Sequence, residues 1–448
     1  CTGDEQRCVP GPAPPPRGPV AADATLCFSE HEVPYGDDPA EQARQAAWFA
    51  ALGRMGVRTL RQQFQWHRIE RAPGEFDWSL PDGRVGAADL HGVETLALLG
   101  YGNYWASALA AEHRDPYYPP DDPQDFARFA AAFAARYPQI TRFEIWNEQN
   151  AGYRFWKHPD GPSGQPDRYA DLLVATAQAI RAVRPDAVVG FGGLFYLPQA
   201  IMGGEAFLEG AYAARPDVGQ AFDALAWHPY SFYPPLDPPE RDTPRGPVDL
   251  YPVDVTAARL QAIMTAHEGP QAVEKPLWIT ELGWPSVMGL DEARQADYLA
   301  RGWLLALAGG VDTYCIYRVL EPDPARDALT PWEPSFGLLR YDADPLDDTP
   351  PAEKPAVAHL TDLRQALAGL RYAARRDPDP RLPPGVHWLV FTDDQGQHAD
   401  VLWAASEPAE VVVPLAGSAQ LTRLGQPPEA AAPPLRLTLD GTPVVIRR

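Results

Sequence analysis

The sequence has very little lysine and no long apolar run. Lysine occurs only at Lys157, Lys275 and Lys354, and the formal net charge is −22 at pH 7. Proteins that bind nucleic acid or anionic membranes present basic surfaces, so we expect neither partner. The same charge would repel a strongly anionic polymer unless a local basic patch meets it. No run of about 18 apolar residues occurs, so no transmembrane helix is predicted.

Cysteine is also scarce, with four residues in the chain. The sequence leaves open whether Cys8 and Cys27 pair across the N-terminal segment, while Cys315 lies in an apolar run and is expected to be a buried thiol. The opening letters CTGD, followed by a proline-rich stretch, resemble the start of a mature bacterial lipoprotein, which begins with an acylated cysteine. An arbitrary chain start is the alternative. We therefore expect a lipid anchor at Cys1 and an extracytoplasmic protein, secreted or held at the bacterial cell envelope.

The N-terminal part of the chain, residues 1–22, is proline-rich. The stretch VPGPAPPPRGPV at 9–20 cannot form a helix or a sheet, because proline fixes φ and removes a hydrogen-bond donor. Such a segment is typical of a semi-rigid extended spacer. We therefore predict that residues 1–22 form a tether rather than part of a folded body.

Residues 23–371 alternate between short β-rich apolar runs and longer helical segments. Eight strands are predicted at 24–29, 57–64, 93–100, 141–147, 187–193, 222–228, 276–282 and 311–319. Eight β-then-α units imply a parallel sheet closed into a (β/α)8 TIM barrel. An open doubly wound sheet is the alternative, but no glycine-rich phosphate turn follows the first strand.

The residue pattern changes in residues 372–448. Short predicted strands are separated there by Gly, Pro and Asp, and helical periodicity is lost. This pattern predicts a small C-terminal antiparallel β domain of the sandwich type.

The side chains suited to catalysis or ligand binding gather where the barrel strands are predicted to end. In barrel enzymes the active site lies at these strand ends. Glu148 follows the fourth strand and Glu281 ends the seventh, so the two carboxylates face each other across the barrel mouth. Glycosidic cleavage needs such a pair: one carboxyl protonates the departing oxygen, and the other attacks the anomeric carbon or activates a water. All three asparagines of the chain, Asn103, Asn147 and Asn150, fall at this same rim.

Two of these strand ends carry recognisable motifs. IWNEQN at 145–150 and WITELGW at 278–284 resemble the strand-four and strand-seven signatures of clan A retaining glycoside hydrolases. Residues 56–78 resemble the strand-two region of family 39, WHPY at 227–230 its strand six, and residues 334–357 the stretch before its last helix. The likeness spans about residues 24–440, with family 39 the best match and family 5 a close rival. The bacterial exopolysaccharide-type members of this group are the nearest in character.

The resemblance implies roles for individual residues. Glu148 would be the acid/base and Glu281 the nucleophile, with Asn147 bonding a sugar hydroxyl and Arg61 and Tyr230 holding Glu281. The further candidates for substrate binding are His228, Asn103, Trp105, Trp284, Tyr317 and His31. For Trp105 and Trp284 packing and sugar stacking are equally supported, and Tyr317 and His31 depart from the family pattern. The aspartate runs at 121–125 and 342–348 lack calcium-loop spacing, and we expect no metal and no cofactor.

Together these features predict a retaining glycoside hydrolase that cleaves β-glycosidic bonds of a polysaccharide or oligosaccharide. A non-catalytic carbohydrate-binding barrel is one alternative, although it would be expected to lose one carboxylate. A transglycosylase using the same residues is the other, because acceptor choice depends on loop shape. Each alternative shares the carbohydrate partner.

Overall fold

The computed structural model describes residues 21–30, 38–196, 203–230, 236–241, 243–245, 248–323, 332–342, 351–377 and 379–448. Cys1, Cys8, the proline-rich stretch and His31 lie outside these ranges, and so does part of the segment that follows the sixth barrel strand.

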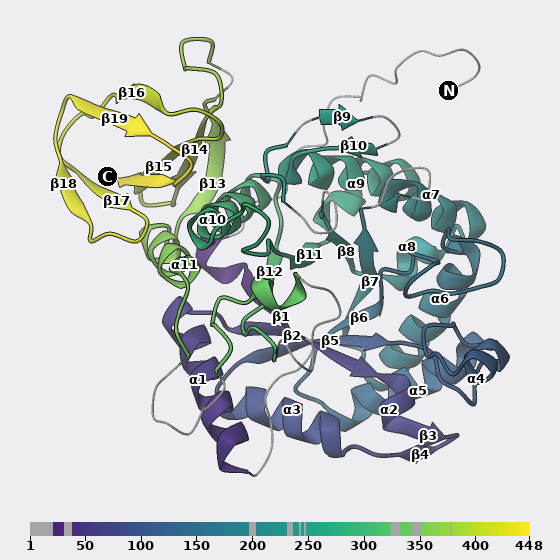
Figure 1. Ribbon diagram of the computed structural model, residues 1–448. Helices are drawn as coiled ribbons and strands as arrows, with labels where there is room; N and C mark the ends of the chain where they lie inside the picture. The colour runs from purple at the N-terminus through teal and green to yellow at the C-terminus, as the bar shows by residue number, and fades with distance from the viewer. Residues whose placement is uncertain are drawn as a thin grey trace, which may run out of the picture.

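The eight predicted strands close into a parallel barrel, which confirms the fold expected from the sequence (Figure 1). Around the barrel the strands follow the order β1-β12-β11-β8-β7-β6-β5-β2, so the first and last strands are neighbours. Their bounds are β1 (Leu26–Glu30), β2 (Thr59–Gln65), β5 (Glu94–Gly100), β6 (Arg142–Asn147), β7 (Val188–Phe195), β8 (Ala224–His228), β11 (Leu277–Leu282) and β12 (Thr313–Tyr317).

Helices cover the outside of the barrel (Figure 1). Four of them begin with proline in the first turn, where the missing N–H costs nothing, and Asp38 and Asp122 cap two of these by accepting backbone N–H groups. The main helices are α1 (Pro39–Met55), α3 (Ser79–Leu90), α5 (Pro123–Arg136), α6 (Pro166–Val183), α7 (Gly204–Ala214), α9 (Val253–Glu268), α10 (Glu292–Ala308) and α11 (Pro355–Ala366). Shorter elements are η1 (Ala22–Ala24), α2 (Trp66–Ile69), β3 (Glu70–Ala72), β4 (Glu75–Phe76), α4 (Ala108–His113), α8 (Val218–Ala221), β9 (Thr243–Arg245), β10 (Val248–Leu250), η3 (Pro270–Glu274) and η4 (Glu333–Phe336).

The barrel has an inner core that is separate from the packing between strands and helices. Leu96, Ala224, Ala226 and Trp278 form their own buried cluster, and they come from strands on different sides of the barrel. The Trp278 ring occupies so much of this space that a Cβ on Gly190 would lie 2.6 Å from it. The interior is therefore filled below the mouth, as expected for an eight-stranded barrel.

A disulfide joins Cys27 to Cys315 and corrects both cysteine expectations. Cys27 of β1 and Cys315 of β12 are direct partners in the parallel register, with Cα atoms 4.1 Å apart. Cys27 therefore does not pair with Cys8, and Cys315 is not a free thiol. The physical reason is barrel closure, which places the first and last strands side by side although 288 residues separate the two cysteines.

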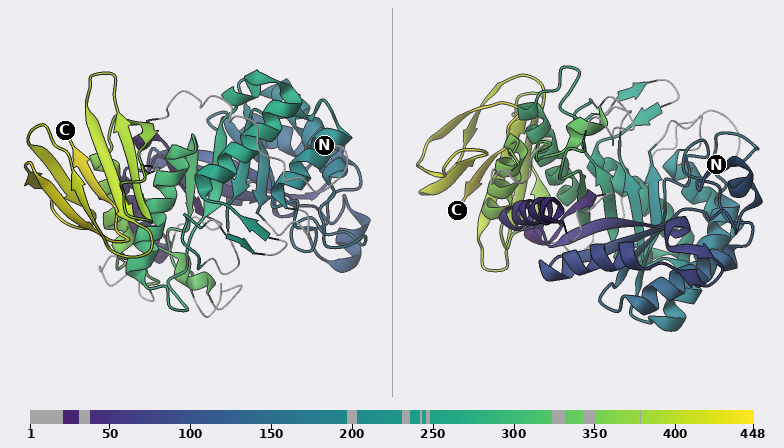
Figure 2. Two further views of the ribbon diagram at one scale, coloured as in Figure 1. Left: turned by 90° about the horizontal axis from the view of Figure 1, so that it is seen from above. Right: turned by 60° about the horizontal axis from the view of Figure 1, so that its bottom comes forward.

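The C-terminal region forms antiparallel sheets, which lie beside α10 and α11 in both Figure 1 and Figure 2. Six strands follow the order β13-β14-β15-β20-β17-β18, and β16 pairs with β19. Alternating inward residues such as Val411, Val413, Leu437 and Leu439 build a separate apolar core. The bounds are β13 (Arg371–Arg375), β14 (Val386–Thr392), β15 (His398–Ala404), β16 (Ala409–Val413), β17 (Ala419–Arg423), β18 (Glu429–Ala431), β19 (Leu435–Leu439) and β20 (Val444–Arg447).

Polar contacts tie this β domain to the barrel. Glu240, in the loop after β8, pairs with the buried Arg301 of α10 and also accepts a hydrogen bond from Trp403 Nε1 of β15 at 2.8 Å. The loop that borders the barrel mouth is thus anchored to both parts of the molecule. Within the described ranges, no helix is both long and apolar enough to cross a membrane.

Candidate active site

The acid/base candidate Glu148 sits in an irregular turn directly after β6. Trp146 and Glu148 have φ angles of 72° and 49°, in the left-handed region, which costs non-glycine residues roughly 1–2 kcal/mol each. The turn is held by Glu148 N–H bonding Gly193 O at 2.9 Å and by Trp146 Nε1 bonding Phe155 O at 2.7 Å. In a regular strand consecutive side chains point to opposite faces. The turn instead lets Asn147 and Glu148 both reach groups in the barrel mouth.

The nucleophile candidate Glu281 also lies at an irregular point of its strand. The pairing of β11 with β12 shifts register between Ile279 and Leu282. Thr280 Oγ1 donates to Glu144 at 3.1 Å, while the neighbouring Glu281 accepts from Tyr230 OH at 3.2 Å. Two consecutive side chains of one strand therefore contribute to one site, because a bulge breaks the strict alternation.

Arg61 of β2 is the cation that organises the mouth, and it is 1% exposed. Its Nε and Nη2 bond the two oxygens of Glu144 at 2.6 and 2.9 Å, and Nη2 also bonds Asn147 Oδ1 at 2.7 Å. Its Nη1 bonds Ser29 Oγ at 3.1 Å and Glu281 Oε2 at 3.3 Å. These bonds match the five N–H donors of a guanidinium.

Arg61 stays protonated although it is buried. Burial alone lowers the pKa of Arg61, but the charge and hydrogen bonds of Glu144, together with the charge of Glu281, outweigh it and hold the pKa above its ordinary value. A permanent cation beside Glu281 favours the ionised form that a nucleophile needs. The contact of Arg61 with Glu281 is as the family resemblance implied.

Glu144 of β6 was missed by sequence reasoning, although a charged residue inside the apolar run RFEIWN is a usable signal. It is fully buried, and besides both bonds to Arg61 it accepts from Gly193 N–H at 2.9 Å and from Thr280 Oγ1 at 3.1 Å. Every direction around this carboxylate is taken by a donor. Glu144 therefore serves to hold Arg61, and it offers nothing to a substrate.

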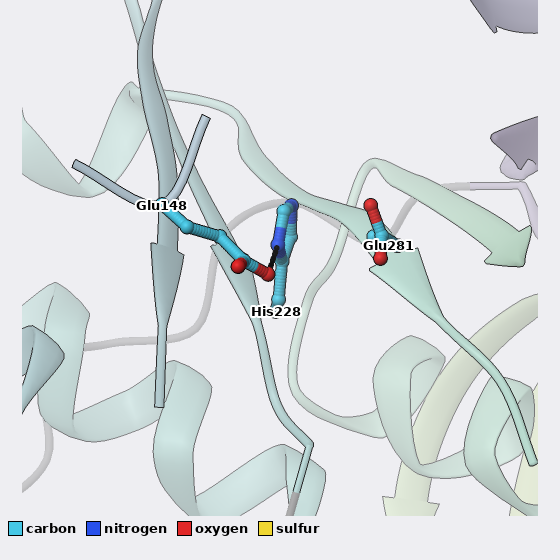
Figure 3. Close-up of side chains that lie close together, drawn as sticks. All are labelled: Glu148, His228 and Glu281. Carbon is cyan, nitrogen blue, oxygen red and sulfur yellow. Dashed lines mark hydrogen bonds and ion pairs between the residues drawn. The ribbon is translucent and has the colours of Figure 1, made fainter. Parts of the chain in front are cut away.

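The two candidate carboxylates flank His228 (Figure 3). One ligand atom from each of Glu148, His228 and Glu281 lies within 4.8 Å of the others. Such a short separation suits a pair that acts directly on one carbon, since carboxyls that activate a water between them stand about 6.5–9.5 Å apart. The carboxyls of retaining enzymes stand about 5–5.5 Å apart, which is close to this geometry.

The hydrogen bonds of His228 place a proton between it and Glu148. Thr280 has one hydroxyl hydrogen, which it donates to Glu144, so its oxygen accepts from His228 Nε2 at 3.1 Å. The other ring nitrogen, Nδ1, lies 2.9 Å from Glu148 Oε1. A hydrogen bond there requires one shared proton, carried either by the imidazole or by the carboxyl. A carboxyl that exchanges a proton in this way is suited to acid/base chemistry.

The same three side chains are also the group of His, Cys, Asp and Glu residues whose spacing could hold a metal ion within the described parts of the chain. Glu148 Oε1 and His228 Nδ1 already bond each other, and the Arg61 cation beside Glu281 would repel a metal ion. Acid/base chemistry therefore explains the cluster better than metal binding.

The remaining sequence candidates are largely supporting residues. Asn103 Nδ2 and Trp105 Nε1 both bond the carbonyl oxygen of Glu70, at 2.6 and 3.2 Å, and so brace the loop after β2. Trp284 is 3% exposed and its Nε1 bonds Asp237 O at 2.8 Å, which favours packing over sugar stacking. Tyr317 is buried and its hydroxyl donates to Glu333.

Two further groups at the rim were not anticipated. Glu30 at the end of β1 forms a buried ion pair with Arg318 after β12, at 2.6 Å. Arg154, in the loop after β6, places Nη1 3.7 Å from Glu148 Oε2. A pocket borders the site where Tyr230 and Trp284 meet Asp237, Arg241 and Tyr251. The loop after β8 therefore contributes Asp237 and Arg241 to the lining of this pocket.

Solved structures share this architecture over nearly the whole chain. A family 39 glycoside hydrolase from Bacteroides cellulosilyticus WH2 is 20% identical, covers 96% of this chain and 82% of its own, and has a TM-score of 0.69. A GH39 β-xylosidase from Caulobacter crescentus is 18% identical with 97% of each chain covered and a TM-score of 0.63. A GH30 endoxylanase from Clostridium papyrosolvens C71 is 10% identical, again with 97% of each chain covered, at a TM-score of 0.59. No protein-family model and no curated protein matches the sequence. The structural similarity to family 39 expected from the motifs is thus confirmed for the fold.

Proposed function

We propose that this chain is a retaining glycoside hydrolase that cleaves β-glycosidic bonds of an oligosaccharide or polysaccharide. The observation that carries the proposal is the placement of Glu148 and Glu281 on facing strand ends, with one oxygen of each within 4.8 Å. The similar folds of a family 39 glycoside hydrolase and a GH39 β-xylosidase support it. A binding barrel would not need both carboxylates with separate, matched partners.

The geometry supports a double displacement. Glu281, held by Arg61 and Tyr230, attacks the anomeric carbon, and the bond from that carbon to the leaving oxygen breaks. Glu148 gives its proton to that oxygen, which leaves a glycosyl ester on Glu281. In the second half, Glu148 takes a proton from water, the water oxygen attacks the anomeric carbon, and the ester bond breaks to restore both side chains.

Neighbouring residues position the reacting groups. Asn147 is fixed by Arg61 and would bond the sugar hydroxyl next to the anomeric carbon, a contact that strengthens as charge develops. His228 keeps a proton available to Glu148. Glu148 Oε2 is buried without a hydrogen-bond partner among the described residues, which is the condition expected of an atom that meets the substrate.

The location proposed is outside the cytoplasm. The Cys27–Cys315 disulfide supports this, because disulfides persist in oxidising compartments and are rare in the cytosol. A lipid anchor at Cys1 would hold the enzyme at the envelope. Mass spectrometry of the protein from its native membrane fraction tests the anchor by the added mass of acyl chains.

The first experiment is hydrolysis of a panel of aryl β-glycosides, including β-xylosides, alongside β-glucans. Glu148→Gln should lower kcat by about 10²–10⁴-fold, the usual contribution of general acid/base catalysis, and Glu281→Gln should lower it at least as much because no glycosyl ester can form. Glu209→Gln, a half-exposed carboxyl on α7, is the matched control and should keep full activity. Equal activity in all four proteins would reject the two-carboxylate mechanism.

Two refinements separate the roles of the carboxyls. A dinitrophenyl leaving group needs no protonation, so Glu148→Gln should lose much less activity in the first step on such a substrate than Glu281→Gln does. Proton NMR of the first product should show the β anomer. An α anomer would mean inversion and would contradict Glu281 as nucleophile.

A further inference from the structure

Positive charge gathers on one side of the proposed site in a chain that is otherwise strongly acidic. Arg154 lies in the loop after β6, and its Nη1 is 3.7 Å from Glu148 Oε2. Its guanidinium stacks over the ring of Phe155, with 4.4 Å from Cζ to the ring centroid, and its side chain is 35% exposed. The cation is thus held in place by an aromatic face and still reaches solvent.

A second cation lies in the same neighbourhood. Lys157, one of three lysines in the chain, pairs with Asp115 at 2.6 Å and stands 5.6 Å from the ring centroid of Tyr117. The ring of Phe155, over which Arg154 lies, is 5.2 Å from the ring of Tyr117, so both cations border the same pair of aromatic rings. Burial raises the pKa of Tyr117 and the charge of Asp115 raises it further, whereas Arg154 and Lys157 lower it.

This group of cations is contiguous with the proposed catalytic pair. The rings of Tyr117 and Tyr101 are 4.8 Å apart, and Tyr101 in turn lies within the field of Glu148 and Glu281. Tyr153, which is 48% exposed and feels the charges of Glu148 and Arg154, offers an open aromatic face at the same edge. Arg154 and Lys157 are together called the basic rim below.

The position of the basic rim fixes which part of a substrate it would meet. Glu148 is the carboxyl that protonates the departing oxygen, so the basic rim beside it faces the leaving group. Glu148 Oε2 points to this side without a hydrogen-bond partner among the described residues. A sugar ring bonded through that oxygen would place its substituents next to Arg154.

We propose that the leaving-group side of the site binds an acidic sugar, a uronic acid unit, whose carboxylate is received by Arg154 with support from Lys157. The inference rests on the proposed function and names its substrate class. A planar guanidinium bonds a carboxylate in a fork geometry that neutral sugars cannot use. With a net charge of −22, a local basic rim is also what an anionic glycan would need to approach the protein.

A purely structural role for Arg154 makes a different prediction. If Arg154 only fixes the position of Glu148, its removal would lower the binding affinity for neutral and for acidic ligands by the same factor. If Arg154 receives a carboxylate, the preference for the acidic ligand falls while the neutral ligand changes much less. The ratio of the two affinities therefore separates the roles.

The test measures binding by calorimetry to the Glu281→Gln variant, which cannot turn over its ligand. The two probes are the β-1,4-linked tetramer of glucuronic acid and cellotetraose, which share backbone and linkage and differ in the carboxylate at carbon six. At low salt the acidic tetramer should bind at least tenfold more tightly, and the advantage should shrink as salt screens the charges. Adding Arg154→Gln should reduce the acidic-to-neutral ratio by tenfold or more.

Arg128→Gln in the same background is the matched control, because Arg128 is an exposed arginine on α5 and its removal changes net charge equally. This control should keep the ratio. Equal affinity for both tetramers, no binding of either, or a ratio untouched by Arg154→Gln would overturn the inference. Hydrolysis of neutral glycosides with no preference for acidic ligands would reject the inference alone, whereas acidic binding without hydrolysis by the wild type would reject the proposed function alone.

Discussion

Glu148 at the barrel mouth and Asp400 in the C-terminal β domain are both buried carboxylates, yet their surroundings differ. Asp400 accepts from Trp388 Nε1 at 2.7 Å and from Arg448 Nη2 at 2.5 Å, and His398 lies 3.3 Å away. Glu148 shares one oxygen with His228, and its other oxygen has no hydrogen-bond partner among the described residues. Buried polar groups are costly when left unpaired. Asp400 is thus saturated where only the fold is served, whereas Glu148 keeps one oxygen without a hydrogen bond where a substrate would arrive.

The same contrast exists within the mouth. Glu144 is as buried as Glu148 but is surrounded by four donors from three residues. Its pair with Arg61 sets the frame in which Glu281 and Asn147 are placed. Within the barrel mouth, the number of hydrogen bonds therefore distinguishes the framing carboxylate from the proposed acid/base better than burial does.

The largest effect on stability is expected from breaking the ion pair between Arg61 and Glu144. Arg61→Met leaves Glu144 buried without its cation and should lower the free energy of unfolding by about 3–5 kcal/mol, with loss of activity. Arg61→Met/Glu144→Leu should regain part of that stability, because no charge is left unpaired, and yet remain inactive. Urea unfolding and hydrolysis of the best aryl glycoside measure the two properties. A double variant no more stable than the single one would show that the ion pair is not the cause.

Exchanging the two contrasted carboxyls for amides should separate stability from activity. Asp400→Asn replaces an acceptor of several donors and should cost about 2–3 kcal/mol of unfolding free energy with activity unchanged. Glu148→Gln should leave stability within about 0.5 kcal/mol of the wild type or raise it, since active-site groups are often held at a cost to the fold. Loss of stability in Glu148→Gln equal to that in Asp400→Asn would remove the distinction.

Asp297 of α10 sharpens the comparison because it is incompletely paired although it lies away from the mouth. Burial raises the pKa of Asp297 from 3.8 to about 6, against the lowering effects of Thr442 and Arg301, and its Oδ1 has no hydrogen-bond partner among the described residues. A carboxyl whose folded pKa exceeds its unfolded value stabilises the fold at low pH, and this contribution is lost as pH rises from about 4 through about 6.

Asp297→Asn should therefore raise the unfolding free energy at pH 7 by about 2 kcal/mol and flatten its dependence between pH 4 and 6. Urea midpoints of both proteins across this range measure the effect. Parallel pH profiles for the two proteins would show that another group is responsible.

The barrel and the catalytic pair could be predicted from the sequence for one physical reason. Burial imposes the alternation of short apolar strands with amphipathic helices, and closure of eight units brings the ends of the fourth and seventh strands together. Glu148 and Glu281 follow from that placement. Contacts within the long loops do not, because they depend on how segments far apart in sequence pack. The bonds of Asn103 and Trp105 to the Glu70 carbonyl are of this kind.

The disulfide between Cys27 and Cys315 could also have been predicted from the expected barrel. The expected barrel already placed the first strand beside the eighth, and both strands carry a cysteine near the middle. A pair of Cys27 with Cys8, which the sequence left open, rests on sequence proximity and not on the predicted topology. The buried ion pair of Glu144 could likewise have been predicted. A charge at an inward position of a barrel strand needs a buried partner, and Arg61 is the cation at an inward position of the second strand.

The bond between Cys27 and Cys315 also changes the connectivity of the molecule. The backbone between these residues and the disulfide form a covalent ring that runs once around the barrel. A protease that cuts any single loop inside this ring opens the ring without releasing a fragment, so both ends stay attached through the seam of β1 and β12. Nicked protein would therefore migrate as one species on a non-reducing gel and as two after reduction.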